Sequence, residues 1–519
     1  MPVTSALEVD RAAASLTPDV AVGVRRLDTI RGIARLGATW TGVRVRCYPS
    51  RTVGLAAFVL YTAASLVRFA RMNAGIDLAI FTQAVQQYSQ GHLPWSYLKA
   101  AWGFNLLGDH FTPVVGLLAP FYRLWPDARV LLVAQGALAG LAAAVVTRSA
   151  VRALGRRTGA AIGLGFALAW GIQSTVLFDF HEVAFALPLL ALSLAELAGG
   201  REVRAIAWAL PLMVVKEDSV FLLLGIALFL VVRRRWWPAA GLAAFAVCTF
   251  ALIVGVLMPA IGYYGTYTYW SSSAATGGTL TSLWTSVTSG KAIILVLALL
   301  APSLGLAVRS PIALIALPSL ASRLTSANET YWGVHFHYNA TVTVILVFAA
   351  IDALHQVQAR KHWNPRMVAR GAWAVLAASV IATWVLPLGA TARSVVQPCP
   401  ACTAIPTALN AIPDHASVAA DDTLAAYLVD RDYVHELGPG LLDSAGNPLF
   451  PEYIAVDRSL DSMWARPFSL SGWRETLVRP AADFGGPYQF VCEHVLATSD
   501  GTILYDVLIL HTPYPSSPR

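Results

Sequence analysis

The residues of this chain best suited to chemistry are charged or polar groups that stand beside long apolar segments. The first is Asp77, which follows the apolar segment 52–70 and belongs to the sequence I-D-L-A-I-F-T-Q. A carboxylate in this position can take the proton from an acceptor hydroxyl, provided that its pKa and reach suit the reaction. The alternative is a negative charge that the dipole of a helix N-terminus favours. We favour the catalytic interpretation.

Two further segments combine carboxylates with histidines. Asp109 and His110 belong to G-D-H-F-T-P, and Asp179, His181 and Glu182 belong to F-D-F-H-E. Such groups bind divalent cations or cation–phosphate complexes, so a Mg²⁺ or Mn²⁺ cofactor is compatible with them. Their spacing fits no zinc-site pattern. A solvated loop charge or a helix cap is the alternative for any single one of them.

A lysine and two acidic residues interrupt the apolar sequence again. Lys216, Glu217 and Asp218 lie between two apolar segments with hardly any other charge. Lys216 is a candidate for contacting a phosphate oxygen as a point charge. It is equally a candidate for neutralising Glu217 or Asp218 within the protein, because such pairs are common in membranes.

Histidines and tyrosines form the last polar set. His335, His337 and Tyr338 belong to G-V-H-F-H-Y. The two histidines share a face on a strand but not on a helix, so neutral hydrogen-bonding roles are favoured over metal binding. The tyrosine-rich segment 263–270 suits the aromatic belt of a membrane interface better than sugar or headgroup packing.

The composition around these residues is that of a membrane protein. Of the 519 residues, 56% are hydrophobic and only 13% are charged, whereas about 25% are charged in a soluble domain. The net charge of +7 does not indicate a nucleic-acid partner, because the arginines cluster in short segments between apolar runs. That pattern indicates membrane topology.

Apolar segments bounded by charges and prolines predict about eleven transmembrane helices, several shorter than the usual minimum of roughly 17 residues. They lie near residues 52–70, 129–147, 159–177, 184–198, 203–215, 219–232, 238–260, 291–308, 311–321, 339–353 and 372–390. Lysine and arginine fall on alternate loops, as expected when they mark the cytoplasmic side. The arm 1–51 is then cytoplasmic, and residues 71–129 form a large external loop in which the apolar segment 111–124 does not span.

This threading divides the chain into the arm, a multi-span domain of residues 52–390 and an outer domain of residues 391–519. The outer segment is richer in Pro, Asp and Gly and contains short strand-like segments, so it predicts a small α/β domain. All the polar sets then lie at the outer face. Ionisable groups at membrane depth usually face a cavity or a partner, so we expect them to form one site.

In combination, these segments resemble a known family. The chain is similar to the predicted bacterial membrane protein family DUF2079 in I-D-L-A-I-F-T-Q, G-D-H-F-T-P-V, L-A-P-F-Y-R-L-W-P, D-F-H-E, K-E-D, H-F-H-Y and the later D-D-T-L-A-A-Y-L-V-D-R. That family looks related to the C-type (GT-C) glycosyltransferases, which take a sugar from a polyprenyl-phosphate carrier. The resemblance implies a GT-C-like all-α membrane fold in the bacterial plasma membrane, with Asp77 as the catalytic carboxylate and Asp109 or His110 next.

The leading hypothesis is therefore a membrane glycosyltransferase with an inverting mechanism. Its partners are membrane lipids, a polyprenyl-phosphate sugar donor and a glycan or protein acceptor in the cell envelope, and the outer domain shapes access for the acceptor. Lys216 and Arg71 contact the donor phosphate. The expected substrate-binding set is Arg71, Gln83, Asp179, His181, Glu182, Lys216, Glu217, Asp218, His335, His337 and Tyr338.

Two alternatives stay open. The first is a transporter or lipid-handling protein in which the buried charges line a pathway. Transporters often show paired halves with broken helices, and the sequence shows no such pairing. The second is an outer domain that serves as a binding or assembly module, with Cys399 and Cys402 of C-P-A-C in a structural disulfide.

Overall fold

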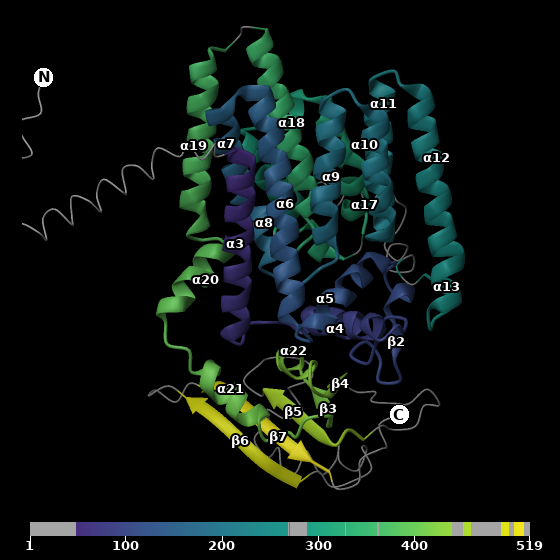
Figure 1. Ribbon diagram of the computed structural model, residues 1–519, viewed down its shortest axis with the longest axis vertical. Coiled ribbons are helices and arrows are strands. Elements are labelled where there is room, and N and C mark those ends of the chain that lie inside the picture. Colours follow the sequence, from purple (N-terminus) through teal and green to yellow (C-terminus); the bar gives the residue numbers. More distant parts are fainter. Residues whose placement is uncertain are drawn as a thin grey trace, which may run out of the picture. The chain divides into compact units, whose positions relative to one another are not determined.

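Helices make up most of the computed structural model (Figure 1). Among the described residues, five helices are long and apolar enough to cross a membrane. They are α3 (Pro49–Ala70), α6 (Arg129–Leu154), α12 to α13 (Trp236–Ile261), α18 (Ala340–Ala359) and α19 (Pro365–Thr383). The pair α7 (Arg156–Ala167) and α8 (Trp170–Val176) makes a sixth if the 45° bend between them is one broken span.

The structure describes residues 48–267, 269, 288–326, 328–360, 363–437, 450–457, 489–497 and 503–512. Residues 1–47 of the predicted arm therefore lie outside the described residues. Met1–Tyr48 and Pro49–Arg519 are separate units, and every element described below belongs to the second.

Shorter helical segments complete the membrane part. They are α9 (Val183–Ala198), α10 (Glu202–Ala209), η3 (Leu210–Val214), η4 (Glu217–Ser219), α11 (Val220–Val232), α16 (Gly290–Leu300), η6 (Ala301–Ser303), η7 (Leu306–Arg309), η8 (Pro311–Ala316), α17 (Leu317–Leu324), η9 (Glu329–Trp332) and α20 (Pro387–Val396). Each of the predicted spans falls on helical residues, which confirms the predicted fold class. The number of about eleven crossings stays a prediction, because only five or six of the described helices are long and apolar enough to cross a membrane.

Helix α3 packs closely against α6 and forms hydrogen bonds to the C-terminal residues of α7 and α8. A Cβ added at Gly140 would lie 2.7 Å from the carbonyl oxygen of Gly54, so the two backbones meet where neither helix carries a side chain. The Tyr61 hydroxyl donates to the Ala167 carbonyl at 2.5 Å, and the Ser65 hydroxyl donates to the Val176 carbonyl at 3.3 Å. These contacts hold the start of the first loop beside α8.

The first loop folds into short elements that pack on one another. They are α4 (Ile76–Ser89), β1 (Trp95–Ser96), β2 (Phe104–Asn105), η1 (Leu106–Gly108), η2 (Pro113–Leu118) and α5 (Ala119–Leu124). The helical residues Pro113–Leu124 would extend about 18 Å even as one straight helix, and the hydrocarbon core is about 30 Å thick. This segment is therefore too short to cross the membrane.

A five-stranded sheet with strand order β4-β3-β5-β7-β6 forms the core of the outer domain. Strands β3 (Ser417–Ala420), β4 (Tyr433–Glu436) and β5 (Tyr453–Asp457) run parallel, whereas β6 (Gln489–Ala497) and β7 (Ile503–His511) are antiparallel to their neighbours. Helices α21 (Ala401–Leu409) and α22 (Ala425–Leu428) lie in the same region. The sheet confirms that a small α/β region follows the membrane helices.

Direct hydrogen bonds join the outer domain to the first loop. The Tyr427 hydroxyl accepts from the backbone N–H of Ala74 at 3.0 Å, and the Gln83 Nε2 donates to the Val434 carbonyl at 2.9 Å. Asp430 accepts from the Tyr122 hydroxyl and from the N–H of Ala128. The sheet therefore has a fixed position over α4.

Candidate functional site

The loop between α8 and α9 positions the N-terminus of α4. Asp179 Oδ1 accepts the N–H of Gly75 at 3.1 Å, and a Cβ on Gly75 would lie 2.6 Å from Asp179 Oδ2. The buried Gln135 orders the same loop, since its Nε2 donates to the Asp179 carbonyl and its Oε1 accepts from the His181 N–H. Asp77, in the first turn of α4, is thus held against this loop.

Asp77 and two histidines form the centre of the site. His181 Nε2 lies 3.3 Å from Asp77 Oδ2, and the rings of His181 and His337 stack with their centroids 3.8 Å apart. Burial raises the pKa of Asp77, but the hydrogen bond and charge of His181 outweigh it, so the pKa falls below its usual value. Asp77 therefore stays ionised at neutral pH.

Lys216 pairs with a carboxylate that is distant in sequence. Its Nζ lies 3.0 Å from Glu182 Oε1, and the two side chains are 16% and 3% exposed. The prediction that Lys216 would neutralise Glu217 or Asp218 is therefore wrong as to its direct partner, since Glu217 instead accepts from His110 Nδ1 at 2.8 Å. Lys216 and Glu217, although adjacent in sequence, therefore have different partners.

The first loop brings a further ion pair to the same region. Lys99 Nζ lies 2.9 Å from Asp109 Oδ2, and the Tyr269 hydroxyl donates to Asp109 Oδ1 at 2.9 Å. The Tyr267 hydroxyl donates to Glu217 Oε1 at 3.2 Å. Two tyrosines of the segment 263–270 thus contact carboxylates of the site, whereas the sequence favours a membrane-interface belt for this segment. Residues 268 and 270 lie outside the described residues.

A cavity of about 200 Å³ lies beside these groups and is lined by several of them. Its polar lining combines cationic, carboxylate and aromatic side chains: His110, Glu182, Lys216, Glu217, Asp218, Tyr267, Tyr269, Arg323, Tyr331, His337 and Tyr338. Asp77 reaches its edge through the stack of His181 on His337. The structure therefore brings together most of the predicted polar sets.

Arg323 is the main residue that the sequence analysis missed. Its guanidinium donates to the carbonyls of Tyr331 and Tyr338 and to Asn339 Oδ1, so it holds the H-F-H-Y segment against the cavity. The available signal was a lone arginine at the end of an apolar segment, near the predicted outer face. Lys99 was also missed, because nothing in its neighbourhood of the sequence marks it.

Five of the predicted substrate-binding residues do not line the cavity. Asp179 and His181 contact the start of α4 as described above, and Arg71, Gln83 and His335 lie elsewhere among the described residues. Arg71 donates to the carbonyls of Gln397 and Pro398, beside the disulfide that joins Cys399 and Cys402. The amide of Gln83 is buried and satisfied: its Oε1 accepts from three groups of residues 96–98 and its Nε2 donates to the outer domain. The exposed His335 and these two residues do not line the cavity. Arg71 and Gln83 therefore connect segments of the chain.

A protein-built metal site is not assembled in the part of the chain that the structure describes. No three His, Cys, Asp or Glu side chains come together there in a metal-binding arrangement. Several of the carboxylates and imidazoles considered as ligands for Mg²⁺ or Mn²⁺ instead form ion pairs within the protein, such as Glu182 with Lys216 and Glu217 with His110. The cation stays an untested prediction, and no step below depends on it.

The buried Asp179 gives a testable dependence of stability on pH. Burial raises its pKa to about 6, above the unfolded value, so the folded state binds the extra proton between pH 4 and pH 6. Stability is then lost as the pH rises through this window, by roughly 3 kcal/mol for this group. Asp179→Asn keeps the acceptor for Gly75, so it is expected to match the wild type near pH 4 and to be more stable at pH 7.

Unfolding of the detergent-solubilised chain at both pH values measures this difference. The matched control is Asp414→Asn, whose carboxylate is 70% exposed, and this surface substitution should change the free energy of unfolding by no more than about 0.5 kcal/mol. A variant of Asp179 that is less stable than the wild type at pH 7 would contradict the burial argument.

Comparison with known proteins identifies the family of this chain. The chain matches the family model described as "Predicted membrane protein (DUF2079)" over residues 68–474. It matches no curated protein.

The solved structures that resemble the chain in fold include the following two. One is ArnT from Cupriavidus metallidurans bound to undecaprenyl phosphate, with a TM-score of 0.56 and 14% identity over 90% of this chain and 99% of that one. The other is the oligosaccharyltransferase of Archaeoglobus fulgidus in complex with Zn and sulfate, with a TM-score of 0.47 and 12% identity over 87% and 72%. The likeness to ArnT, a GT-C glycosyltransferase, confirms the predicted GT-C-like fold.

Proposed function

We propose that this chain, which belongs to the DUF2079 family of predicted membrane proteins, transfers a sugar from a polyprenyl-phosphate donor to a hydroxyl of a cell-envelope acceptor. The observation that carries the proposal is the contact of Asp77 with His181, which stacks on His337 at the wall of a cavity that Lys216, His110 and Arg323 also line. A base beside a cationic cavity suits transfer from a phosphate leaving group. The GT-C-like fold supports the same reaction class.

The proposed reaction is a single displacement. The acceptor oxygen attacks the anomeric carbon on the face opposite the phosphate, so the configuration inverts. The bond between the anomeric carbon and the phosphate oxygen breaks, and polyprenyl phosphate leaves with the electron pair. Asp77 takes the proton of the acceptor hydroxyl. Because the pKa of Asp77 is low, the proton moves as the forming bond makes the hydroxyl acidic.

Lys216 has the main role at the phosphate in this proposal. Glu182 holds its ammonium in place, and the charges of Glu182, Asp218 and Glu217 outweigh burial and raise its pKa well above the usual value. Lys216 therefore stays protonated. A fixed cation at the cavity wall stabilises the charge that develops on the departing phosphate.

The edge of the outer domain closes the site on the acceptor side. Asp422 follows β3 and Glu436 ends β4, at the carboxyl ends of parallel strands, where ligands of such sheets commonly bind. Burial and then the charge of Asp77 raise the pKa of Asp422. Burial and the charge of Asp422 raise the pKa of Glu436, and the charge of Lys99 opposes this rise in part. Asp422 thus lies within electrostatic range of Asp77, and Glu436 within range of Asp422 and Lys99. We propose that these two carboxylates accept hydrogen bonds from the acceptor.

Glu436→Gln is expected to raise the KM for the acceptor about tenfold and to leave the KM for the donor unchanged, since a charged hydrogen bond contributes roughly 1.5–3 kcal/mol. Initial rates over a range of acceptor concentrations measure this split. Asp414→Asn, on the exposed surface of the same domain, is the matched control. An effect on the donor KM alone would contradict the assignment.

The transfer itself is tested with the purified full chain in lipid. A labelled sugar on polyprenyl phosphate is supplied with cell-envelope acceptor, and both the labelled product and the freed polyprenyl phosphate are measured. The expected result is that labelled product and free polyprenyl phosphate form in equal amounts. Movement of intact donor across the membrane without cleavage would instead support the transporter.

A further inference from the structure

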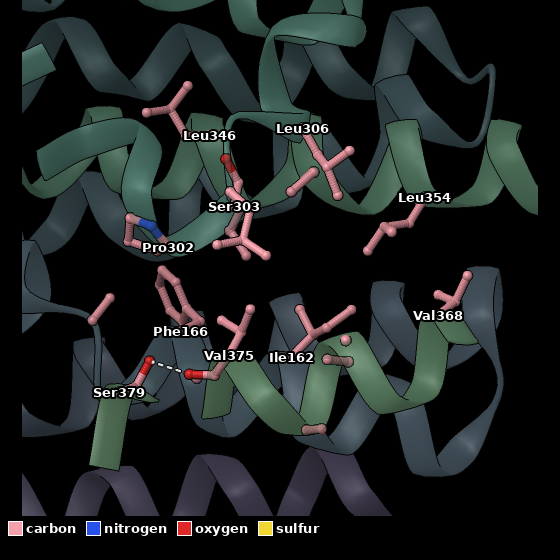
Figure 2. A pocket seen from close by; sticks show the side chains of 18 of the residues that line it. Ile162, Phe166, Pro302, Ser303, Leu306, Leu346, Leu354, Val368, Val375 and Ser379 are labelled. Carbon is pink, nitrogen blue, oxygen red and sulfur yellow. Dashed lines mark hydrogen bonds between the residues drawn. The ribbon is translucent and has the colours of Figure 1, made fainter. Parts of the chain in front are cut away.

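A second and larger cavity lies within the membrane helices, away from the site described above. Its volume is about 400 Å³, and its walls come from α7, α18, α19 and the turns η6 and η7. Figure 2 shows Ile162 and Phe166 facing Leu306 and Leu346 across it. Polar side chains are few in this lining, so the cavity suits a hydrocarbon chain rather than a polar ligand.

The length of the cavity corresponds to one leaflet of a bilayer. Its lining runs along α19 from Val368 to Ser379, which at the helical rise is about 16 Å. The hydrocarbon core of a bilayer is about 30 Å thick, so each leaflet contributes about half of that. Figure 2 places Leu354 and Val368 at one end and Ser379 at the other.

Four arginines stand on the same wall elements at the Leu354 and Val368 end. Arg309 ends η7, Arg360 follows α18, and Arg366 and Arg370 lie in the first turns of α19. None of the four forms an ion pair with a carboxylate of the described residues. Cations at the N-terminus of a helix are disfavoured by its dipole, so Arg366 and Arg370 do not stabilise α19 itself.

The nearest carboxylate on these elements is already used within the protein. Asp352 of α18 accepts from the Ser310 hydroxyl at 2.5 Å and from Gln356 Nε2 at 2.8 Å. The positive charge of the arginine cluster therefore lies at the Leu354 and Val368 end of an apolar cavity, without a paired carboxylate among the described residues. An anionic headgroup with an acyl chain complements both features, because basic sites between transmembrane helices bind such headgroups.

We propose that this cavity binds one acyl chain of an anionic phospholipid, whose phosphate is held by Arg360, Arg366 and Arg370. The occupant belongs to the leaflet on the arginine side. The polyprenyl donor is not the expected occupant. In the proposed function its phosphate binds near His337, which precedes the start of α18, whereas Arg360 follows the C-terminal end of that helix. Twenty helical residues separate these ends by about 30 Å.

The glycines of the lining allow the cavity to be filled without a clash. A Cβ at Gly371 of α19 or at Gly165 of α7 meets no atom within 4 Å. Leucine at either position would occupy the space of the acyl chain, and leucine favours a helix more than glycine does. Gly241→Leu on α12 is the matched control, because its Cβ also meets no atom within 4 Å and it lies outside the cavity.

The test is native mass spectrometry of the full chain after reconstitution with dioleoylphosphatidylglycerol or dioleoylphosphatidylcholine. The wild type and Gly241→Leu are expected to retain phosphatidylglycerol but not phosphatidylcholine. Gly371→Leu and Gly165→Leu should each retain at least about tenfold less. Equal retention in all four proteins, or equal retention of the two lipids, would overturn the proposal.

A second pair of variants tests the headgroup. Arg366→Gln with Arg370→Gln is expected to lower retention of phosphatidylglycerol roughly tenfold or more, since each basic residue contributes to binding an anionic surface. Arg233→Gln with Arg234→Gln removes the same charge from the exposed turn before α12 and should have no effect. Identification of polyprenyl phosphate as the lipid lost from Gly371→Leu would also overturn the proposal.

Discussion

Replacing Asp77 by asparagine is expected to lower the rate of sugar transfer at least about a thousandfold and to leave the fold unchanged. A positioned general base contributes roughly 10²–10⁴ in rate, and an amide cannot take the proton of the acceptor. Asparagine has the same size and still accepts a hydrogen bond from His181 Nε2. The side chain of Asp77 is 37% exposed, so the substitution creates no buried unsatisfied group.

The measurement is the initial rate of polyprenyl phosphate release, with thermal unfolding in the same detergent as a check on folding. Asp127→Asn is the matched control, because it removes a carboxylate from the same loop that is paired with Arg129 and not with the cavity. A rate for Asp77→Asn within a few-fold of the wild type would show that another group acts as the base.

Replacing Lys216 by methionine is expected to lower the free energy of unfolding by about 3–5 kcal/mol. The substitution leaves Glu182, only 3% exposed, as a buried charge whose principal partner is gone. Denaturant unfolding in detergent measures the loss. The matched control is Arg235→Met, which breaks the surface pair with Glu202 and should cost no more than about 1 kcal/mol.

The double variant Glu182→Gln with Lys216→Met separates the two roles of Lys216. It removes both charges at nearly constant volume, so stability is expected to return close to that of the wild type. Sugar transfer should stay lost, because the cation that meets the donor phosphate is absent. Recovery of transfer together with stability would reduce Lys216 to a structural partner of Glu182.

Much of the fold could be predicted because its signals are local. The length of apolar segments and the placement of arginines are read within short windows, and the helices fall where they indicate. The segment 111–124 illustrates the point: a crossing there would move the arginine segments that follow to the outer face, so the placement of arginines argues against it. The lengths of the apolar segments and the positions of the arginines between them thus predict the membrane helices.

The pairing within the site could not be predicted, because it depends on contacts between distant segments. His110 meets Glu217 although 107 residues separate them, and Lys216 meets Glu182 rather than its neighbours in sequence. Arg71 was expected at the phosphate because it is close to Asp77 in sequence, yet it turns toward Gln397 and Pro398. Proximity along the chain does not determine the direction of a long side chain.

The central claim is that one cavity holds the donor phosphate while Asp77 faces the transferred sugar. An experimental structure of the full chain with a non-cleavable polyprenyl-phosphate sugar analogue tests it most directly. The account predicts a phosphate oxygen about 3 Å from Lys216 Nζ, with the sugar between the phosphate and Asp77. A phosphate bound elsewhere, for example at Arg366 and Arg370, with no sugar near Asp77, would contradict it.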